Sequence, residues 1–286
     1  MENQILNAIL LIFSFFFGTA VGSFLNVCVY RLPREMSVVR PRSRCPKCEE
    51  TIQWYDNIPI LSYLVLGAKC RHCRTVISWQ YPLVEGLTGA LFLLVYWRFG
   101  ISLATPVYLL LTSGLVLVTF VDLDDWTIPN EVTYPGIPIG LCCSAIAMFY
   151  PESGLAIPGM YETVFDALIG VVAGGGSLYV LDKLTLILFK KRGMGFGDVK
   201  LLAMLGAFFG WKGVIMIILL ASIVGSIVGI TMITISKKKT TIEEGGEETT
   251  GHYLPFGPYL AVAGLLVMFF GGQVYNYYIG AFSVGP

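Results

Sequence analysis

Four of the seven cysteines form two CxxC pairs in one polar stretch of the sequence. The pairs are Cys45-Pro-Lys-Cys48 and Cys70-Arg-His-Cys73, and residues 49–69 separate them. A CxxC turn directs two thiolates toward one point, so two such turns can complete the tetrahedral four-sulfur site that Zn²⁺ favours. Four thiolates leave no open position for a catalytic water, and the spacing therefore predicts a structural zinc site. Four unliganded thiols in a loop are the alternative.

Two acidic segments stand at the ends of apolar stretches, where carboxylates could do acid–base chemistry. Asp122 begins the segment Asp122-Leu-Asp-Asp-Trp-Thr-Ile-Pro-Asn130, and Asp198 ends the segment Gly193-Met-Gly-Phe-Gly-Asp198. An ionisable residue at the edge of a membrane span is costly, which makes it a functional candidate. When two carboxylates are brought together, one of them keeps a proton near neutral pH. One could then act as general base on water and the other as general acid toward a peptide carbonyl.

Three glycines precede Asp198, at positions 193, 195 and 197. Glycine allows unusual backbone angles and close approach of another chain, so an extended substrate peptide would find room beside Asp198. Spacing alone leaves open that the acids are ordinary interfacial residues and the glycines a flexible turn. Glu85, near the start of another apolar stretch, could line a polar cavity or sit at the membrane interface.

The elements that position these groups must be membrane helices, because the composition is that of a membrane protein. Of the 286 residues, 55% are hydrophobic and 13% are charged, with a mean hydropathy of +0.72. A soluble globular domain carries about a quarter charged residues. The 19 basic and 19 acidic residues balance, which argues against a nucleic-acid binder and against an acidic disordered chain. We therefore expect an all-α polytopic protein whose partner is the lipid bilayer, with no nucleic acid.

About eight transmembrane helices are predicted from apolar stretches, seven of them near 20 residues long. These seven are Ile5–Tyr30, Leu83–Trp97, Leu103–Val121, Val132–Tyr150, Val164–Phe189, Val214–Ser236 and Pro255–Tyr278. A shorter stretch, Val199–Trp211, would cross only with support from the protein around it. The predicted domains are then a first transmembrane helix at 1–31, a small zinc-binding loop domain at 32–80 and a transmembrane domain at 81–286.

Most of the basic residues fall in three loops, at 31–74, 190–192 and 237–239. With eight crossings these loops share one side of the membrane, which the positive-inside rule assigns to the cytoplasm. Both termini then face outward, and Asp122 and Asp198 lie at the same cytoplasmic level of the bilayer. The cytoplasm is reducing, which argues against structural disulfides among the four loop cysteines.

Taken together, the motifs resemble those of the type IV prepilin peptidases, also called prepilin leader peptidase/N-methyltransferases. The matching segments follow the family order from near residue 18 to near residue 264. They are Gly22-Ser-Phe-Leu-Asn-Val-Cys-Val-Tyr-Arg-Leu-Pro33, the two CxxC pairs with Trp54-Tyr-Asp-Asn-Ile-Pro59 between them, Tyr81-Pro-Leu-Val-Glu85, Asp122 to Ile128-Pro-Asn130, Gly193-Met-Gly-Phe-Gly-Asp198-Val-Lys-Leu201 and Pro255-Phe-Gly-Pro258.

The resemblance implies a membrane aspartic endopeptidase of the GxGD kind, with catalytic residues Asp122 and Asp198 and with 81–286 as the peptidase domain. Such enzymes cleave the basic leader from prepilins or pseudopilins at the cytoplasmic face of the bacterial inner membrane. Asp122 is preferred to Asp124 because the family's aspartate stands six residues before the isoleucine of Ile-Pro-Asn. Asp124 or Asp125 could instead tune the pKa of the pair.

The resemblance also implies a second activity and two cofactors. The four-cysteine loop marks the bifunctional branch of the family, which N-methylates the new N-terminal residue of the substrate. The expected cofactors are therefore a structural Zn²⁺ and S-adenosylmethionine as methyl donor. No glycine-rich nucleotide motif is present, so the sequence does not place the S-adenosylmethionine site.

Two functions of other classes stay open at this point. A proton-coupled transporter with a structural zinc loop would use the acids as a proton relay and Val199–Trp211 as a broken-helix binding site. It predicts inverted repeats, which are not visible, and it leaves the cysteines without a role. A membrane-anchored zinc module that serves as a docking platform is the other alternative, and it would not need Asp122 or Asp198.

Overall fold

The structure is a computed structural model that describes residues 2–157, 159, 163–190, 194–239 and 255–283. Within these ranges it is helical, and its only β-pairing consists of two isolated bridges, Arg44 with Thr51 and Lys69 with Val76. The predicted all-α class is therefore confirmed for the described part of the chain. Gly193 and the predicted basic residues 191–192 lie outside the described residues.

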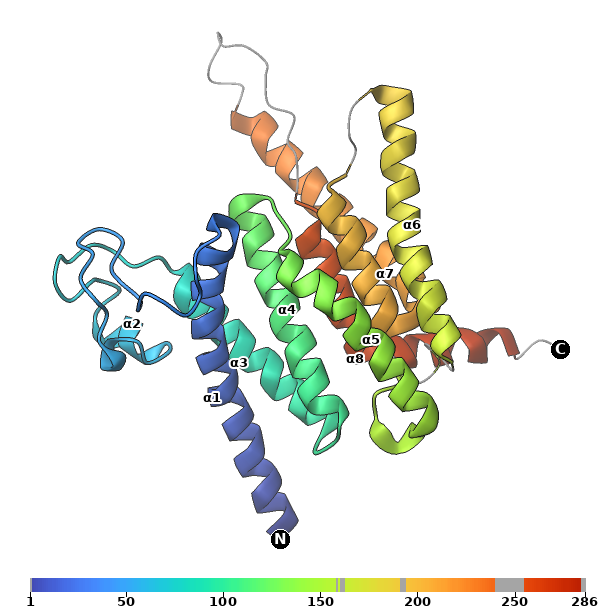
Figure 1. Cartoon of the computed structure of the whole chain (residues 1–286), viewed down its shortest axis with the longest axis horizontal. Helices are drawn as coiled ribbons and strands as arrows, with labels where there is room; N and C mark the ends of the chain where they lie inside the picture. The colour runs from blue at the N-terminus through green and yellow to red at the C-terminus, as the bar shows by residue number, and fades with distance from the viewer. Residues whose placement is uncertain (1, 158, 160–162, 191–193, 240–254, 284–286) are drawn as a thin grey trace. The chain divides into compact units, whose positions relative to one another are not determined.

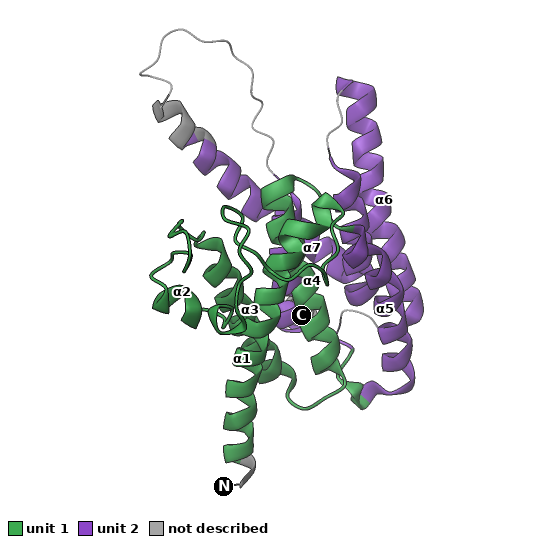
Figure 2. Ribbon diagram, turned by 60° about the vertical axis from the view of Figure 1, so that its left-hand side comes forward, with its two compact units in different colours: residues 1–129, 152–155 green, residues 130–151, 156–286 purple. Residues whose placement is uncertain are grey.

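The chain divides into two compact units (Figure 2). Unit 1 comprises Met1–Pro129 with Glu152–Leu155, and unit 2 comprises Asn130–Pro151 with Ala156–Pro286. The helices of unit 1 are α1 (Glu2–Arg31), η1 (Leu32–Arg34), η2 (Trp54–Asp56), α2 (Leu61–Val65), α3 (Gln80–Phe99) and α4 (Ala104–Asp125). Those of unit 2 are α5 (Asn130–Phe149), α6 (Val164–Phe189), α7 (Phe196–Lys239) and α8 (Gly257–Ser283), and η3 (Pro151–Ser153) bridges the boundary in sequence.

In unit 1, α1 packs directly against α3, and α4 contacts both (Figure 1). The close approach depends on small residues, since a Cβ on Gly18 would lie 2.7 Å from Cβ of Phe92. In the same way, a Cβ on Gly89 would lie 2.7 Å from Cγ2 of Thr19. Because α1 and α3 flank the cysteine loop in the sequence, their packing brings the two ends of that loop together.

In unit 2, α7 packs against α5, α6 and α8, and its contact with α6 is a glycine crossing. A Cβ on Gly170 or on Gly206 would lie well inside the van der Waals contact distance to the other residue's carbonyl oxygen. Gly174, one turn beyond Gly170, faces the carbonyl oxygen of Leu202 at similarly short range. Small residues spaced by four let membrane helices pack backbone against backbone, and this crossing follows that rule.

Six helices in the described part of the chain are long and apolar enough to cross a membrane: α1, α4, α5, α6, α7 and α8. Large apolar side chains on α1 point outward, with Ile5, Phe13 and Phe16 each more than 60% exposed. Such exposure is costly in water and is normal against lipid acyl chains. The described chain therefore has the surface of a polytopic membrane protein.

The predicted helices differ from the observed ones in two places. The predicted stretch Leu83–Trp97 is helical as α3, but α3 is not among the six apolar helices, since Gln80, Glu85 and Arg98 make it more polar. The predicted stretches Val199–Trp211 and Val214–Ser236 are joined in α7, which is interrupted only at Gly210 (φ 66°, ψ −179°). That left-handed φ is one that L side chains rarely adopt, so glycine permits the break. The count of eight crossings stays a prediction.

The α6–α7 crossing predicts opposite effects for two glycines of the same helix. Gly170→Ala should destabilise the protein by about 1–3 kcal/mol, because the added methyl group has no space against Gly206. Gly176→Ala should be neutral or stabilising, because a Cβ there meets no atom within 4 Å and alanine favours the helix. Thermal unfolding of both variants in detergent tests this. A Gly170→Ala midpoint equal to that of Gly176→Ala would contradict the packing.

Candidate functional site

The four cysteines of the loop come together in one cluster. The Sγ atoms of Cys45, Cys48, Cys70 and Cys73 all lie within 4.8 Å of one another, and those of Cys45 and Cys73 are 3.7 Å apart. This is the set that the CxxC spacing predicted. Four sulfurs converging on one point fit a tetrahedral metal ion, and the donor set is the one that Zn²⁺ takes in structural sites.

The two CxxC turns have the same backbone construction. In the first turn, Glu49 has φ 57° and donates its N–H to the carbonyl of Cys45, while Cys45 donates its own N–H to the carbonyl of Glu50. In the second, Arg74 has φ 58° and donates to the carbonyl of Cys70, which donates in turn to Thr75. The two CxxC segments therefore form turns of the same backbone conformation, and the sulfurs of the two turns point toward each other.

Backbone hydrogen bonds within these turns favour thiolates. The N–H of Cys48 is the largest cause that lowers the pKa of the Cys45 thiol to about 6. The pKa of the Cys70 thiol is lowered in the same way, mainly by the N–H of Cys73 and then by that of His72. Metals bind the deprotonated thiolate, so the turns prepare the cluster for a cation.

An ion pair ties the second CxxC turn to the middle of the loop. Arg71 donates from Nε to Oδ2 of Asp56 at 2.8 Å and from Nη2 to Oδ1 at 2.5 Å. The Arg71 guanidinium also lies 5.6 Å from the ring centroid of Tyr55, and it holds the pKa of the Asp56 carboxyl below its usual range. This two-bond ion pair, the Asp56–Arg71 fork, links η2 to the four-cysteine cluster. Its residues are 15 positions apart and belong to no local motif, so no sequence pattern indicated it.

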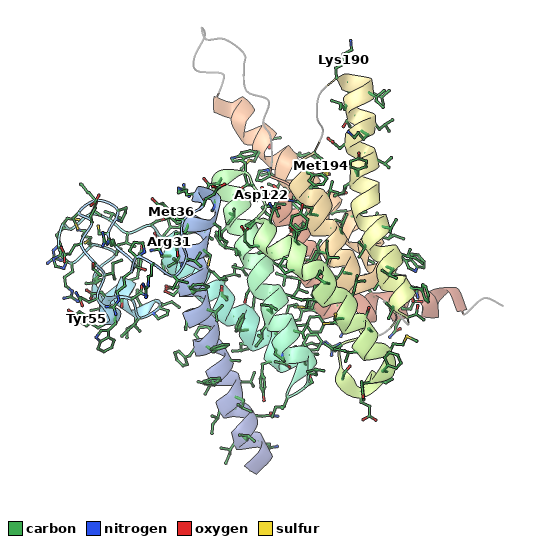
Figure 3. The ribbon with its side chains drawn as sticks, in the orientation of Figure 1. Arg31, Met36, Tyr55, Asp122, Lys190 and Met194 are labelled. Atoms are coloured by element: carbon green, nitrogen blue, oxygen red, sulfur yellow. The ribbon has the colours of Figure 1, made fainter. Side chains whose placement is uncertain are left out.

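Asp122 lies in the last turn of α4 in unit 1 and is only 6% exposed (Figure 3). The neighbouring carboxylates are engaged at the surface. Asp124 accepts a hydrogen bond from Nε2 of Gln80 at 2.7 Å, and Asp125 pairs with Arg34 at 3.1 and 3.3 Å. Of the three acids in this segment, Asp122 is therefore the buried one.

Asp198 lies in the first turn of α7 in unit 2 and is 7% exposed. A carboxylate is favoured at the N-terminus of a helix by the partial positive charge of the free N–H groups. A Cβ on Gly195 would lie 3.4 Å from Oδ2 of Asp198, which is ordinary van der Waals contact, so Gly195 lies directly beside this carboxylate. The predicted role of the glycines in admitting a substrate peptide stays a prediction, and Gly193 lies outside the described residues.

Within unit 2, the start of α5 contacts the start of α7. Nζ of Lys200 donates to Oδ1 of Asn130 and lies 5.1 Å from the ring centroid of Tyr134. Asn130 closes the Ile-Pro-Asn motif, and Lys200 follows Asp198 by two positions. The structure therefore brings together two motifs that sequence reasoning had identified separately. Asp122 and Asp198 belong to different units, and each is described here within its own.

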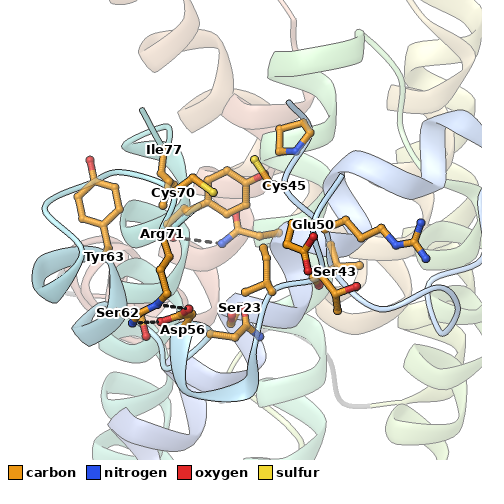
Figure 4. Close-up of a pocket in the computed structure, with 18 of the residues that line it drawn as sticks. Ser23, Ser43, Cys45, Glu50, Asp56, Ser62, Tyr63, Cys70, Arg71 and Ile77 are labelled. Atoms are coloured by element: carbon orange, nitrogen blue, oxygen red, sulfur yellow. Dashed lines mark hydrogen bonds and ion pairs between the residues drawn. The ribbon is translucent and has the colours of Figure 1, made fainter. Parts of the chain in front are cut away.

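A cavity of about 740 Å³ lies within unit 1, between the end of α1, the cysteine loop, α2 and the start of α3 (Figure 4). Glu85 lines this cavity and is 7% exposed, and its Oε2 accepts a hydrogen bond from the N–H of Ile60 at 2.7 Å. Of the two roles left open for Glu85, the structure gives it a place in a polar cavity. The cavity itself was not predicted, because its walls come from four separate segments.

Buried polar side chains on α1 hold the entrance of the loop in place. Arg31, near the end of α1 (Figure 3), donates to the carbonyls of Ser37 and Pro41 at 2.8 Å each. One turn earlier, Nδ2 of Asn26 donates to the carbonyl of Tyr81 at 3.1 Å. These bonds fasten both ends of the loop to the membrane helices.

Two family models cover most of the chain. Residues 16–99 match the Bacterial Peptidase A24 N-terminal domain, and residues 109–230 match the Type IV leader peptidase family. No solved structure matches the chain.

Curated relatives of similar sequence share one name, prepilin leader peptidase/N-methyltransferase. The one from Myxococcus xanthus is 42% identical over 222 residues, which are 78% of this chain and 63% of the relative. The one from Pseudomonas aeruginosa is 36% identical over 285 residues, covering 92% of this chain and 91% of the relative. The one from Neisseria gonorrhoeae is 36% identical over 274 residues, covering 87% of each.

The four-cysteine cluster predicts that zinc is lost when one of its cysteines is replaced. Purified protein should contain about one zinc ion per chain, and Cys70→Ser should reduce this to near zero, because three thiolates no longer close the tetrahedral site. Cys142→Ser is the matched control, since Cys142 is exposed and outside the cluster. Elemental analysis by mass spectrometry measures both. Undiminished zinc in the Cys70→Ser protein would exclude the four-cysteine site.

The Asp56–Arg71 fork predicts a smaller effect on metal retention. Asp56→Asn should speed the transfer of zinc to a chromogenic chelator by about 1.5- to 5-fold, the effect of losing an ion pair whose arginine side chain is half-exposed. Asp125→Asn removes the Arg34 pair outside the loop and should leave the transfer rate unchanged. Equal rates in the two variants would show that the fork does not support the cluster.

Proposed function

Because the chain belongs to the type IV leader peptidase family, we propose that it cleaves the leader peptide from type IV prepilins or pseudopilins. It then N-methylates the new N-terminal residue with S-adenosylmethionine, as the names of its relatives indicate for them. The observation that carries the proteolytic assignment is burial, because each acidic motif keeps one carboxylate out of water, Asp122 in unit 1 and Asp198 in unit 2. The family match favours this enzyme over the transporter and the docking platform.

We propose Asp122 and Asp198 as the catalytic pair. Residues 123–129 link Asp122 to Asn130, and Asn130 contacts Lys200 beside Asp198. The chain itself therefore tethers Asp122 to the segment that carries the second acid. One carboxylate would take a proton from water, whose oxygen forms the new bond to the scissile carbonyl carbon. The other, still protonated, would give its proton to the carbonyl oxygen. As the C–N bond breaks, the leaving amine would take the proton that the first carboxylate had removed from water, and the carbonyl oxygen would return its proton to the second carboxylate.

The cysteine loop has a supporting role in this proposal. A loop of this length buries too little apolar surface to fold stably by itself, and a bound Zn²⁺ would supply folding energy. The four thiolates of the cluster leave the ion no open position, so zinc would not activate water here. S-adenosylmethionine would supply an electrophilic methyl group to the amino nitrogen that proteolysis frees.

The proposed orientation places the loop and both acids toward the cytoplasm and both termini outward, in a multi-pass protein of the bacterial inner membrane.

The break at Gly210 divides α7 into the helical pieces 196–209 and 211–239. Counting these separately and including α3 gives eight helical segments, which supports the predicted eight crossings. A prepilin has a basic leader and an apolar helix, so its scissile bond would lie at the cytoplasmic interface.

The catalytic pair predicts which aspartates are essential. Asp122→Asn and Asp198→Asn should each lower cleavage of a prepilin by about 10²- to 10⁴-fold or more, because an amide can neither accept nor give the required proton. Asp125→Asn, on the same turn as Asp122, should keep cleavage near the wild-type rate, since Asp125 pairs with Arg34 at the surface.

The measurement is the appearance of mature pilin, followed by mass spectrometry with the purified protein in detergent. Zinc content and thermal midpoint serve as checks that each variant is folded. Full activity of either Asp122→Asn or Asp198→Asn in a folded protein would refute the aspartic mechanism.

A further inference from the structure

We propose that the cavity of unit 1 is the binding site for S-adenosylmethionine. This inference rests on the proposed methyl transfer and deepens it, because nothing in the sequence placed the methyl donor. At about 740 Å³, the cavity is within the 300–1,000 Å³ that is typical of small-molecule sites. Among the described residues, neither Asp122 nor Asp198 lines it, so it is separate from the proposed proteolytic pair.

The cavity has one buried charge that suits a cationic ligand. Glu85 is 7% exposed, and the polar groups beside its carboxylate are the N–H of Ile60 and the hydroxyl of Ser23. A carboxylate can accept about four hydrogen bonds, so this one has capacity left for a ligand. A buried carboxylate is costly until a partner offsets its desolvation. The sulfonium and ammonium groups, or the ribose hydroxyls, of S-adenosylmethionine provide such partners.

The rest of the lining fits the other parts of the same ligand. Tyr63 and Tyr81 contribute aromatic surface on which an adenine ring can pack, and Ile58 and Ile77 add apolar surface. Figure 4 shows Cys45 and Cys70 on one side of the cavity, with Ser23, Asp56 and Ser62 across from them. The metal cluster therefore forms part of the wall, and the folding of the loop shapes the cavity.

The charge balance of the lining distinguishes this ligand from the basic leader of a prepilin. Four carboxylates line the cavity, and four guanidinium groups line it as well. The carboxylates are Glu49, Glu50, Asp56 and Glu85, and the guanidinium groups are Arg31, Arg42, Arg44 and Arg71. These charges balance, so the lining has no net negative charge to attract a basic leader, whereas S-adenosylmethionine carries a carboxylate together with its two positive groups and meets both signs.

Direct binding tests the proposal without reference to activity. Full-length protein in detergent would be titrated with tritiated S-adenosylmethionine by equilibrium dialysis, alongside three variants. Glu85→Gln keeps the acceptor for Ile60 and removes the charge, and it should raise the Kd about 10-fold or more. Ser23→Phe fills the cavity from α1 and should abolish detectable binding. Glu152→Gln, an exposed carboxylate away from the cavity, is the matched control and should bind as wild type.

The outcomes separate this inference from the proposed function. Wild-type Kd in both Glu85→Gln and Ser23→Phe, with zinc retained, would overturn the cavity assignment and leave the methyltransferase proposal standing. No binding by the wild-type protein would overturn both. Unchanged S-adenosylmethionine binding together with a 10-fold higher KM for prepilin cleavage in Glu85→Gln would show that the leader occupies the cavity instead, which also refutes the proposal.

Discussion

The cost of holding a carboxylate out of water is the constraint on which this account depends. Removing an ionised carboxyl group from solvent costs several kcal/mol unless a partner, a proton or a hydrogen-bond network compensates it. The chain nevertheless buries Asp122 at the end of α4 and Asp198 at the start of α7, while it leaves Asp124 and Asp125 engaged at the surface. In the proposed pair, the two carboxylates would share a proton, which would reduce this cost and allow the pair to move that proton.

In each unit, helix packing fixes the helix ends from which the acidic residues and the cysteine loop extend. The glycine crossing of α6 and α7 sets the position of the helix that carries Asp198 in its first turn, and the contact between Lys200 and Asn130 ties the start of α5 to it. In unit 1, the close packing of α1 against α3 joins the ends of the cysteine loop, and the convergence of the four cysteines closes the loop itself. The cavity beside Glu85 is the space that these constraints leave between helices and loop.

Features built from residues close together in the sequence, the CxxC turns and most of the apolar helices, were predicted from the sequence alone. The four cysteines were identifiable because each CxxC turn is built within six residues, and the apolar stretches identified most helices because membrane helices are continuous in sequence. Asp122 was distinguished from Asp124 only by resemblance, and the choice stays a prediction; in the structure Asp122 is the buried carboxylate of the two. The separation of Val199–Trp211 from Val214–Ser236 was visible in the sequence, and the structure has the break between them at Gly210, where glycine permits the left-handed φ. The Asp56–Arg71 fork and the cavity beside Glu85 depend on tertiary contacts between distant segments, which periodicity does not encode.

The central claim is that Asp122 and Asp198 act as one pair, and cross-linking measures this most directly. In a protein with Cys28, Cys142 and Cys143 replaced by serine, the Asp122→Cys/Asp198→Cys double variant would be treated with a short thiol-to-thiol reagent, and the products mapped by mass spectrometry. If Asp122 and Asp198 form one pair, the link between positions 122 and 198 should form in high yield. The yield should be much lower when Asp125→Cys replaces Asp122→Cys. Equal yields, or no link at all in a folded protein that retains zinc, would contradict the pair.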